Sequence, residues 1–179
     1  MGVPVETGEG RLNVGGVTTV VYAQFTRPAD TTAYAANDVV SDSTVVGHPL
    51  VFQNCARFQG GTGIIYSGLM FASTDATVNP NFDLVLFDTP SFTMAADNAA
   101  GTVTDTEAYN IVAIVTFDGT NAANVSTVGA NLVIGATAIG QAFKCGSNSR
   151  DLYGMIIDRG GYTPASAEIF RFKLAITQD

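Results

Sequence analysis

The segment F-R-F-K-L-A-I at residues 170–176 decides the fold class of this chain. Its aromatic and aliphatic residues alternate with Arg171, Lys173 and Ala175, so the two groups point to opposite faces of an extended chain. A period of two over this length is typical of a half-buried strand, and helical spacing fits it poorly. The segment therefore predicts a strand with one face in a hydrophobic core.

Other segments rich in β-branched and aromatic residues are separated by Gly, Pro and Asn turns, a pattern that predicts further strands. Residues 64–73 and 111–117 are apolar on both faces, so we expect these strands to be buried on two sides. The other predicted strands are 17–25, 50–58, 82–87, 132–134, 141–145 and 152–157.

Three regions have particular local predictions. Pro28 ends the first strand, and residues 29–42 form a loop in which residues 38–40 make a short edge pairing. A helical turn is expected only between residues 92 and 109, around residues 94–100. In the 50–58 strand, alternation places Phe52, Ala56 and Phe58 on one face and Gln53, Cys55 and Arg57 on the other.

About eight or nine strands with almost no helix predict an all-β fold, an antiparallel β-sandwich that is jelly-roll-like. No repeat at a fixed period is present, which excludes propellers and β-helices. Residues 1–15 are Gly-rich and predict a flexible N-terminal arm. Residues 16–179 are predicted to form a single β-sandwich domain.

Charge and composition exclude several classes of partner. The net charge is −8, and the eight Lys and Arg residues are spread singly along the chain. Nucleic-acid binding needs a clustered basic footprint, and attraction to anionic membrane surfaces needs the same. No apolar run reaches the roughly 20 residues that span a bilayer, and the N-terminus lacks a secretory signal. We therefore expect no nucleic acid or membrane partner and synthesis in the cytoplasm.

Cysteine and histidine give no sign of a metal or catalytic site. Without an export signal, Cys55 and Cys145 are expected to be free, buried thiols, and a disulfide is the alternative after release to an oxidising medium. His48 is the only histidine, and no Cys-x-x-Cys spacing is present. No Ser or Cys lies in a nucleophile elbow. We expect no catalytic, cofactor-binding or metal-binding residues and no cofactor.

Carboxylates and glycines also have structural interpretations. A hydrolase would need two carboxylates about 5–10 Å apart across a sugar cleft, and the candidates are numerous. Most of these acids occur at turns, where Asp accepts from local backbone amides. The glycines at 60–63 have no following Lys and are read as a tight turn. The candidate acids are Asp83, Asp88, Asp97, Asp105, Glu107 and Asp118.

What remains for function is the surface. Tyr34, Tyr109 and Tyr162 lie in a polar context rich in Thr, Ala and Asn. Tyrosine suits flat contacts between protein copies because it combines apolar area with a hydroxyl group. The alternative is that these tyrosines cap the sandwich core. The residues alone leave both interpretations open.

Three segments carry a resemblance to a known family. They are 25–43, which reads F-T-R-P-A-D-T-T-A-Y-A-A-N-D-V-V-S-D-S, the D-N-A-A at 97–100, and 153–176. Together they cover about a third of the chain, and their motifs are structural. In these segments the chain resembles small β-sandwich virion proteins of tailed bacteriophages, of the capsid cement or decoration type.

The resemblance implies a protein that binds the major capsid protein on the outside of a phage head and reinforces it, as a homotrimer and without enzymatic activity. It implies a virion location after synthesis in the host cytoplasm. Residues 1–15 and the 29–42 loop are expected to order onto the lattice. The main alternative is a tail or fibre receptor-binding module that recognises the host surface, and a third is a hydrolase with a carboxylate pair.

Overall fold

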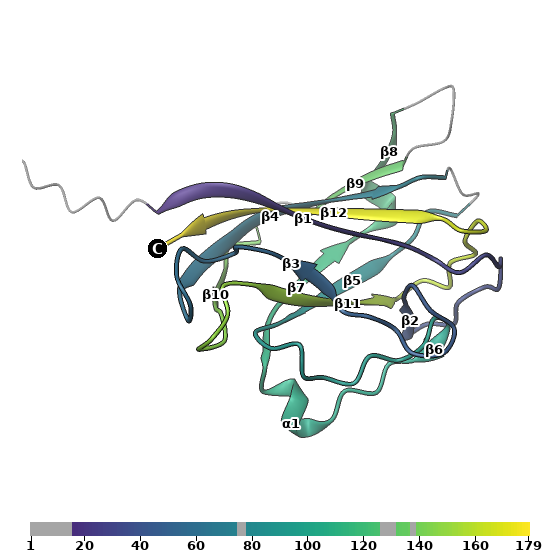
Figure 1. Cartoon of the computed structure of the whole chain (residues 1–179). Coiled ribbons are helices and arrows are strands. Elements are labelled where there is room, and N and C mark those ends of the chain that lie inside the picture. The colour runs from purple at the N-terminus through teal and green to yellow at the C-terminus, as the bar shows by residue number, and fades with distance from the viewer. Residues whose placement is uncertain (1–15, 75–77, 126–131, 137–138) are drawn as a thin grey trace, which may run out of the picture.

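The structure is a computed structural model, and it describes residues 16–74, 78–125, 132–136 and 139–179. The predicted N-terminal arm, residues 1–15, lies outside this part of the chain. The described residues form two antiparallel sheets packed face to face, with only one short α-helix (Figure 1). The predicted all-β sandwich is confirmed. Within the described part, no helix has the length and hydropathy needed to cross a membrane.

Sheet A has the strand order β1-β12-β4-β9-β8, and β10 also pairs with β4. Its longest strands are β4, β12 and the edge strand β1, and β1 and β12 pair over ten positions. The strands are β1 (Val17–Thr26), β4 (Thr62–Ala72), β8 (Ala122–Asn124), β9 (Leu132–Ala136), β10 (Gln141–Lys144) and β12 (Ile169–Gln178).

Sheet B has the order β6-β2-β11-β5-β7, and β3 also pairs with β11. The helix α1 (Asp105–Ala108) precedes β7, and a 3-10 turn (Gly119–Asn121) follows it. The strands are β2 (Asp38–Val40), β3 (Leu50–Phe52), β5 (Phe82–Phe87), β6 (Ala99–Ala100), β7 (Ile111–Phe117) and β11 (Leu152–Asp158).

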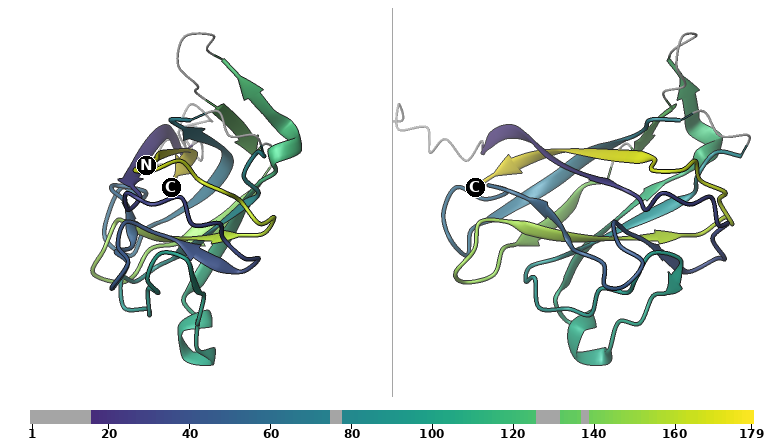
Figure 2. Two further views of the ribbon diagram at one scale, coloured as in Figure 1. Left: turned by 90° about the vertical axis from the view of Figure 1, so that its right-hand side faces the viewer. Right: turned by 45° about the vertical axis from the view of Figure 1, so that its right-hand side comes forward.

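The pairing is nested along the chain, which makes the sandwich a jelly roll. The first strand pairs with the last, β2 and β3 pair with β11, β4 pairs with β9, and β5 pairs with β7. Successive pairs fall in alternate sheets, as in a long hairpin rolled into two layers. Both chain ends of the described part therefore lie in sheet A (Figure 2).

The main core lies between the two sheets. The alternation that defines residues 170–176 is confirmed, because Phe170, Phe172, Leu174 and Ile176 are each 0% exposed. Phe82 of β5 packs edge-on against Phe170 across the interface, with ring centroids 5.3 Å apart. Full burial of one such side chain contributes roughly 1.5–3 kcal/mol relative to exposure.

A second apolar cluster covers the outer face of sheet B. The connection between β5 and β7 passes beneath that sheet (Figure 1), and its Phe92 stacks on Phe87 with ring centroids 3.9 Å apart. Met94 and Val103 from the same connection pack there too. As a result, β11 is buried on both faces over most of its length. The outer face of sheet A has no such cover within the described residues.

The structure corrects two predictions about buried faces. The 64–73 and 111–117 strands are not buried on both sides, because Tyr66 and Leu69 on β4 are 48% and 41% exposed and Ile114 on β7 is 48% exposed. These side chains point away from the sandwich interior. An apolar second face indicates burial only where another part of the protein covers it.

The predicted strand at 50–58 is also too long. It ends at Phe52, because a turn follows in which Asn54 has a φ of 58° and donates its backbone N–H to the Asp151 carboxylate. Strict alternation is lost beyond this turn, so Cys55 and Ala56 are both buried. Phe58, which the alternation placed with Phe52, is exposed.

The helical turn is misplaced within its predicted window. It occupies Asp105–Ala108, where Thr104 and Glu107 form a reciprocal capping box. Ala99–Ala100 instead form the short strand β6. Because β6 pairs with β2, the predicted edge pairing at residues 38–40 lies one strand inside the sheet. The strands β6 and β8 were not predicted.

Candidate functional site

A buried ion pair holds together segments that are distant in sequence. Arg27 donates from Nη2 to Asp97 Oδ2 at 2.7 Å, and both side chains are almost completely buried. Tyr34 donates its hydroxyl to the other Asp97 oxygen at 2.6 Å and accepts a hydrogen bond from Arg27 Nε. The backbone N–H of Ser41 also donates to Asp97. The loop at 29–42 is thereby fixed to the turn at 97–98.

A second buried group joins the same end of the molecule. Tyr162 donates its hydroxyl to the Glu168 carboxylate at 2.8 Å, and the Ala165 backbone N–H donates to Glu168 as well. Backbone bonds link this group to the first, from Tyr34 N–H to the carbonyl of Tyr162 and from Arg27 N–H to the carbonyl of Glu168. Burial raises the pKa of Glu168 above its ordinary value, and burial likewise raises the pKa of the Tyr162 hydroxyl.

These contacts bring together the three segments that carry the family resemblance, 25–43, 97–100 and 153–176. No buried side-chain nitrogen or oxygen of the described residues lacks a hydrogen-bond partner. A fully satisfied buried network stabilises one arrangement of the chain and leaves no polar atom aimed at a ligand. We assign this cluster a structural role.

The outer face of sheet A exposes several large apolar side chains and two cations. Tyr22 of β1 is opposite Lys173 of β12, which is opposite Leu69 of β4, so these three residues form one row across the sheet. Tyr22 is 62% exposed, and the neighbouring Val20 and Tyr66 are 44% and 48% exposed. We call Val20, Tyr22, Tyr66 and Leu69, with Arg171 and Lys173, the outer face of sheet A.

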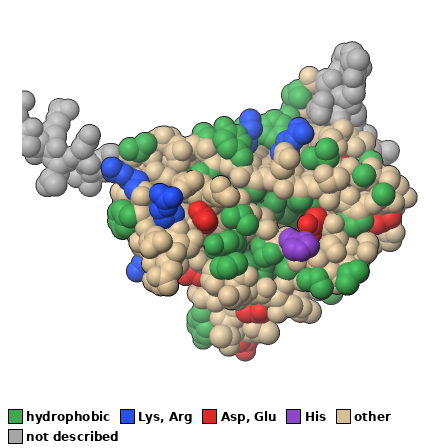
Figure 3. Space-filling model, in the orientation of Figure 1, with side chains coloured by type: hydrophobic (Ala, Val, Ile, Leu, Met, Phe, Trp, Pro, Cys, Tyr) green, Lys and Arg blue, Asp and Glu red, His purple; other side chains and the backbone are tan. Residues whose placement is uncertain are grey.

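Cations lie among the aromatic rings of this face. Lys173 Nζ lies 4.7 Å from the centroid of the Phe71 ring and 5.6 Å from that of Tyr22. Arg171 donates to the Gln24 side chain at 3.0 Å. Neither cation pairs with a carboxylate within the described residues. Figure 3 shows blue side chains among green ones along the upper edge of the molecule, and red ones below.

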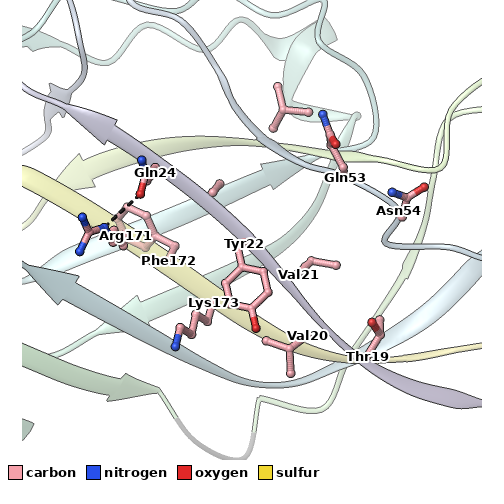
Figure 4. A pocket seen from close by; sticks show the side chains of 12 residues that line it. Thr19, Val20, Val21, Tyr22, Gln24, Gln53, Asn54, Arg171, Phe172 and Lys173 are labelled. Carbon is pink, nitrogen blue, oxygen red and sulfur yellow. Dashed lines mark hydrogen bonds between the residues drawn. The ribbon is translucent and has the colours of Figure 1, made fainter.

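A groove of about 630 Å³ runs along β1 at the border of this face (Figure 4). Of its apolar lining residues, three are exposed and three are at least partly buried. The exposed ones are Val20, Tyr22 and Val51, and the others are Val21, Ala23 and Phe172. Polar side chains and cations complete the lining, and no Asp or Glu is among them. These residues are Thr19, Gln24, Gln53, Asn54, Arg171 and Lys173.

The predicted surface tyrosines separate into two groups. Tyr34 and Tyr162 are buried in the polar network, so the interpretation of these two as surface contacts is wrong and the core interpretation is correct. Tyr109 follows α1 and is 90% exposed. Tyr22 and Tyr66 were missed, although the outward positions of the 17–25 strand could have identified Tyr22.

The candidate acidic residues identified from the sequence have structural surroundings. Asp97 binds Arg27, and Asp83 accepts from Arg159 at 2.7 Å and from Thr116. Glu107 accepts from Thr93 and Thr104, and the Thr104 backbone N–H holds the Glu107 pKa at about 2. Asp118 caps the 3-10 turn, and Asp105 lies in α1. Burial raises the pKa of the Asp88 carboxyl above its ordinary value.

The remaining candidates also have structural surroundings. His48 is exposed and its Nδ1 lies 2.9 Å from an Asp42 oxygen. Cys55 and Cys145 are free and buried, as predicted. No group of three or more His, Cys, Asp or Glu that could hold a metal ion is present in the described part of the chain.

No protein-family model matches this chain, and no curated protein matches it in sequence. Among solved structures, it is similar to a chain of the cyanophage Pam1 capsid asymmetric unit, with 15% identity and a TM-score of 0.33, over 100% of this chain and 93% of that chain. It is also similar to the CBM22-1–GH10 modules of Clostridium thermocellum endo-1,4-β-D-xylanase 10B complexed with xylohexaose. That match has 10% identity and a TM-score of 0.30, and it covers 88% of this chain but only 26% of that chain. At these TM-scores neither similarity supports an argument about function.

Proposed function

We propose that this chain is a structural protein of a bacteriophage virion, a cement protein that binds the outer surface of the head and stabilises it. The observation that carries the proposal is the outer face of sheet A. Large apolar side chains on β1 and β4, the two strands that flank β12, are 41–62% exposed there. A group of exposed large apolar side chains on one face is typical of a surface that binds another protein.

The composition of this face favours a protein partner. Tyrosine and arginine are enriched at the centres of protein interfaces, and both are present here. Arg171 and Lys173 make the face locally cationic in a chain with a net charge of −8. A partner surface that places carboxylates beside apolar groups would complement it. In this proposal the partner is the major capsid protein, and the protein carries out no reaction.

The family resemblance supports the same function. The segments that carry it meet in one buried network around Arg27 and Asp97, so they would specify a scaffold that the family shares. The outer face of sheet A lies outside that network. A homotrimer would multiply weak contacts through effective concentration. Binding to the assembled lattice and not to free capsid subunits would add several kcal/mol of stability by mass action.

Cosedimentation with purified heads and purified tails tests the proposal. We expect stoichiometric binding to heads and none to tails, and reduced binding to heads for the variant Tyr66→Ser/Leu69→Ser. Ile114→Ser is the matched control, because Ile114 is 48% exposed on the outer face of sheet B. Absence of head binding would contradict the proposal, and binding to tails or host glycans would support the receptor-binding alternative.

A further inference from the structure

The edge of β1 is open and unprotected. Among the described residues, β1 pairs only with β12, so its other edge presents unpaired backbone groups along a ten-residue strand. Natural sheets usually protect such edges with charged residues, Pro or bulges. The sequence V-T-T-V-V-Y-A-Q-F-T has no charge and no Pro, and its pairing with β12 has no register shift.

The groove described above lies along β1 and has the features of a site for an added strand. Its exposed apolar lining residues Val20, Tyr22 and Val51 would contact side chains of an extended segment. The unpaired backbone of β1 would supply main-chain hydrogen bonds. Arg171 and Lys173 favour a segment that also carries carboxylates.

We propose that residues 1–15 of a second copy of this chain bind in this groove and add a strand to the free edge of β1. The segment reads M-G-V-P-V-E-T-G-E-G-R-L-N-V-G and combines small apolar residues with Glu6 and Glu9, which outnumber its one cation, Arg11. Fifteen extended residues reach about 50 Å, which is enough to cross to a neighbouring copy. Exchange of this kind is heterologous and can close into a ring.

A second copy is favoured over the same copy by the geometry at Gly16. The segment leads directly into β1, so binding to its own β1 would need the chain to reverse direction before Val17. Gly16 is fitted against β12, because a Cβ added there would lie 1.9 Å from the backbone oxygen of Gln178, and continuation to a neighbouring copy leaves this contact in place.

Charge reversal in the full chain tests this proposal independently of head binding. We expect Glu6→Lys/Glu9→Lys and Arg171→Glu/Lys173→Glu each to weaken self-association about tenfold or more, as measured by sedimentation velocity. The combination of all four substitutions should restore it. Arg57→Glu/Arg150→Glu is the matched control, because both arginines are exposed and lie outside the groove lining.

Lysine acetylation supplies a second measurement. The chain has two lysines, Lys173 at the groove and the exposed Lys144 on β10. In the assembled wild-type protein, we expect Lys173 to be protected and Lys144 to react. A monomeric wild-type protein would overturn the proposal. Protection of Lys173 in that monomer would indicate that the segment folds onto its own copy. Self-association that is insensitive to the charge reversals would overturn it as well. Neither of these two outcomes changes the expected cosedimentation of Tyr66→Ser/Leu69→Ser, which tests head binding.

Discussion

Arg27 Nη2 donates to Asp97 Oδ2 at 2.7 Å, although 70 positions separate the two residues in the chain. The pair lies at one end of the sandwich and fixes the 29–42 loop to the turn before β6. Because both side chains are buried, each charge depends mainly on the other for compensation, and Asp30 adds a weaker contact to Arg27 at 3.4 Å. The pair therefore determines how the loops at this end are arranged.

Removal of the Asp97 charge should strongly destabilise the protein. We expect Asp97→Asn to lower the free energy of unfolding by about 3–5 kcal/mol, because it removes the buried counter-charge of the Arg27 guanidinium and leaves only the more exposed Asp30, at 3.4 Å. Denaturant unfolding measures the change. Asp83→Asn, which breaks the more exposed pair with Arg159, should cost about 1 kcal/mol or less.

The double variant Arg27→Met/Asp97→Leu separates charge from packing. It removes both buried charges, so it should lose less stability than Asp97→Asn alone. Equal losses for Asp97→Asn and Asp83→Asn would show that the buried pair has no special energetic role.

Glu168 should make stability depend on pH. Its folded pKa is raised by burial above the usual 4.5, so the folded state binds the proton more tightly than the unfolded state does. The stability of the wild type relative to Glu168→Gln should therefore rise as the pH falls from about 8 to about 5, toward the usual pKa. Unfolding at several pH values measures the difference.

Glu107→Gln is the control for that experiment. The Glu107 pKa is lowered to about 2, so its contribution is fully present above the usual 4.5 and is lost only as the pH falls further. The difference between the wild type and Glu107→Gln should be constant between pH of about 5 and 8. A constant difference for Glu168→Gln too would contradict the predicted role of the buried carboxyl.

The two cysteines should be unreactive in the folded protein. Burial raises the pKa of the Cys145 thiol to about 12 and also raises that of Cys55, so neither forms the reactive thiolate near neutral pH. A thiol-specific chromogenic reagent should detect no thiol in the native protein and two after unfolding. One equivalent released at once from the native protein would contradict the burial of that thiol.

The fold could be predicted because the core faces follow simple alternation. The 170–176 strand shows this best, since its apolar residues all point into the core. Alternation does not show whether a second apolar face is covered. The outer faces of β11 and β4 are similar in sequence character, yet the β5–β7 connection buries one and leaves Tyr66 and Leu69 on the other exposed.

The candidate site could be predicted only in part. Tyr34 and Tyr162 are in polar, loop-like sequence, and their burial depends on partners such as Asp97 and Glu168 that the jelly-roll pairing brings near. No local pattern records those partners. Tyr22 follows strand alternation, but the row it forms with Lys173 and Leu69 depends on the register between strands that are about 100 or more residues apart in the chain.

Tyrosine nitration on assembled particles tests the central claim most directly, namely that the protein acts by adhesion through the outer face of sheet A. Tyr66 lies on that face and Tyr109 lies beyond α1, so Tyr109 serves as an internal control. We predict that Tyr66 reacts in the free protein and is protected on heads, while Tyr109 reacts in both. Equal reactivity of Tyr66 in the free and head-bound protein would contradict the claim.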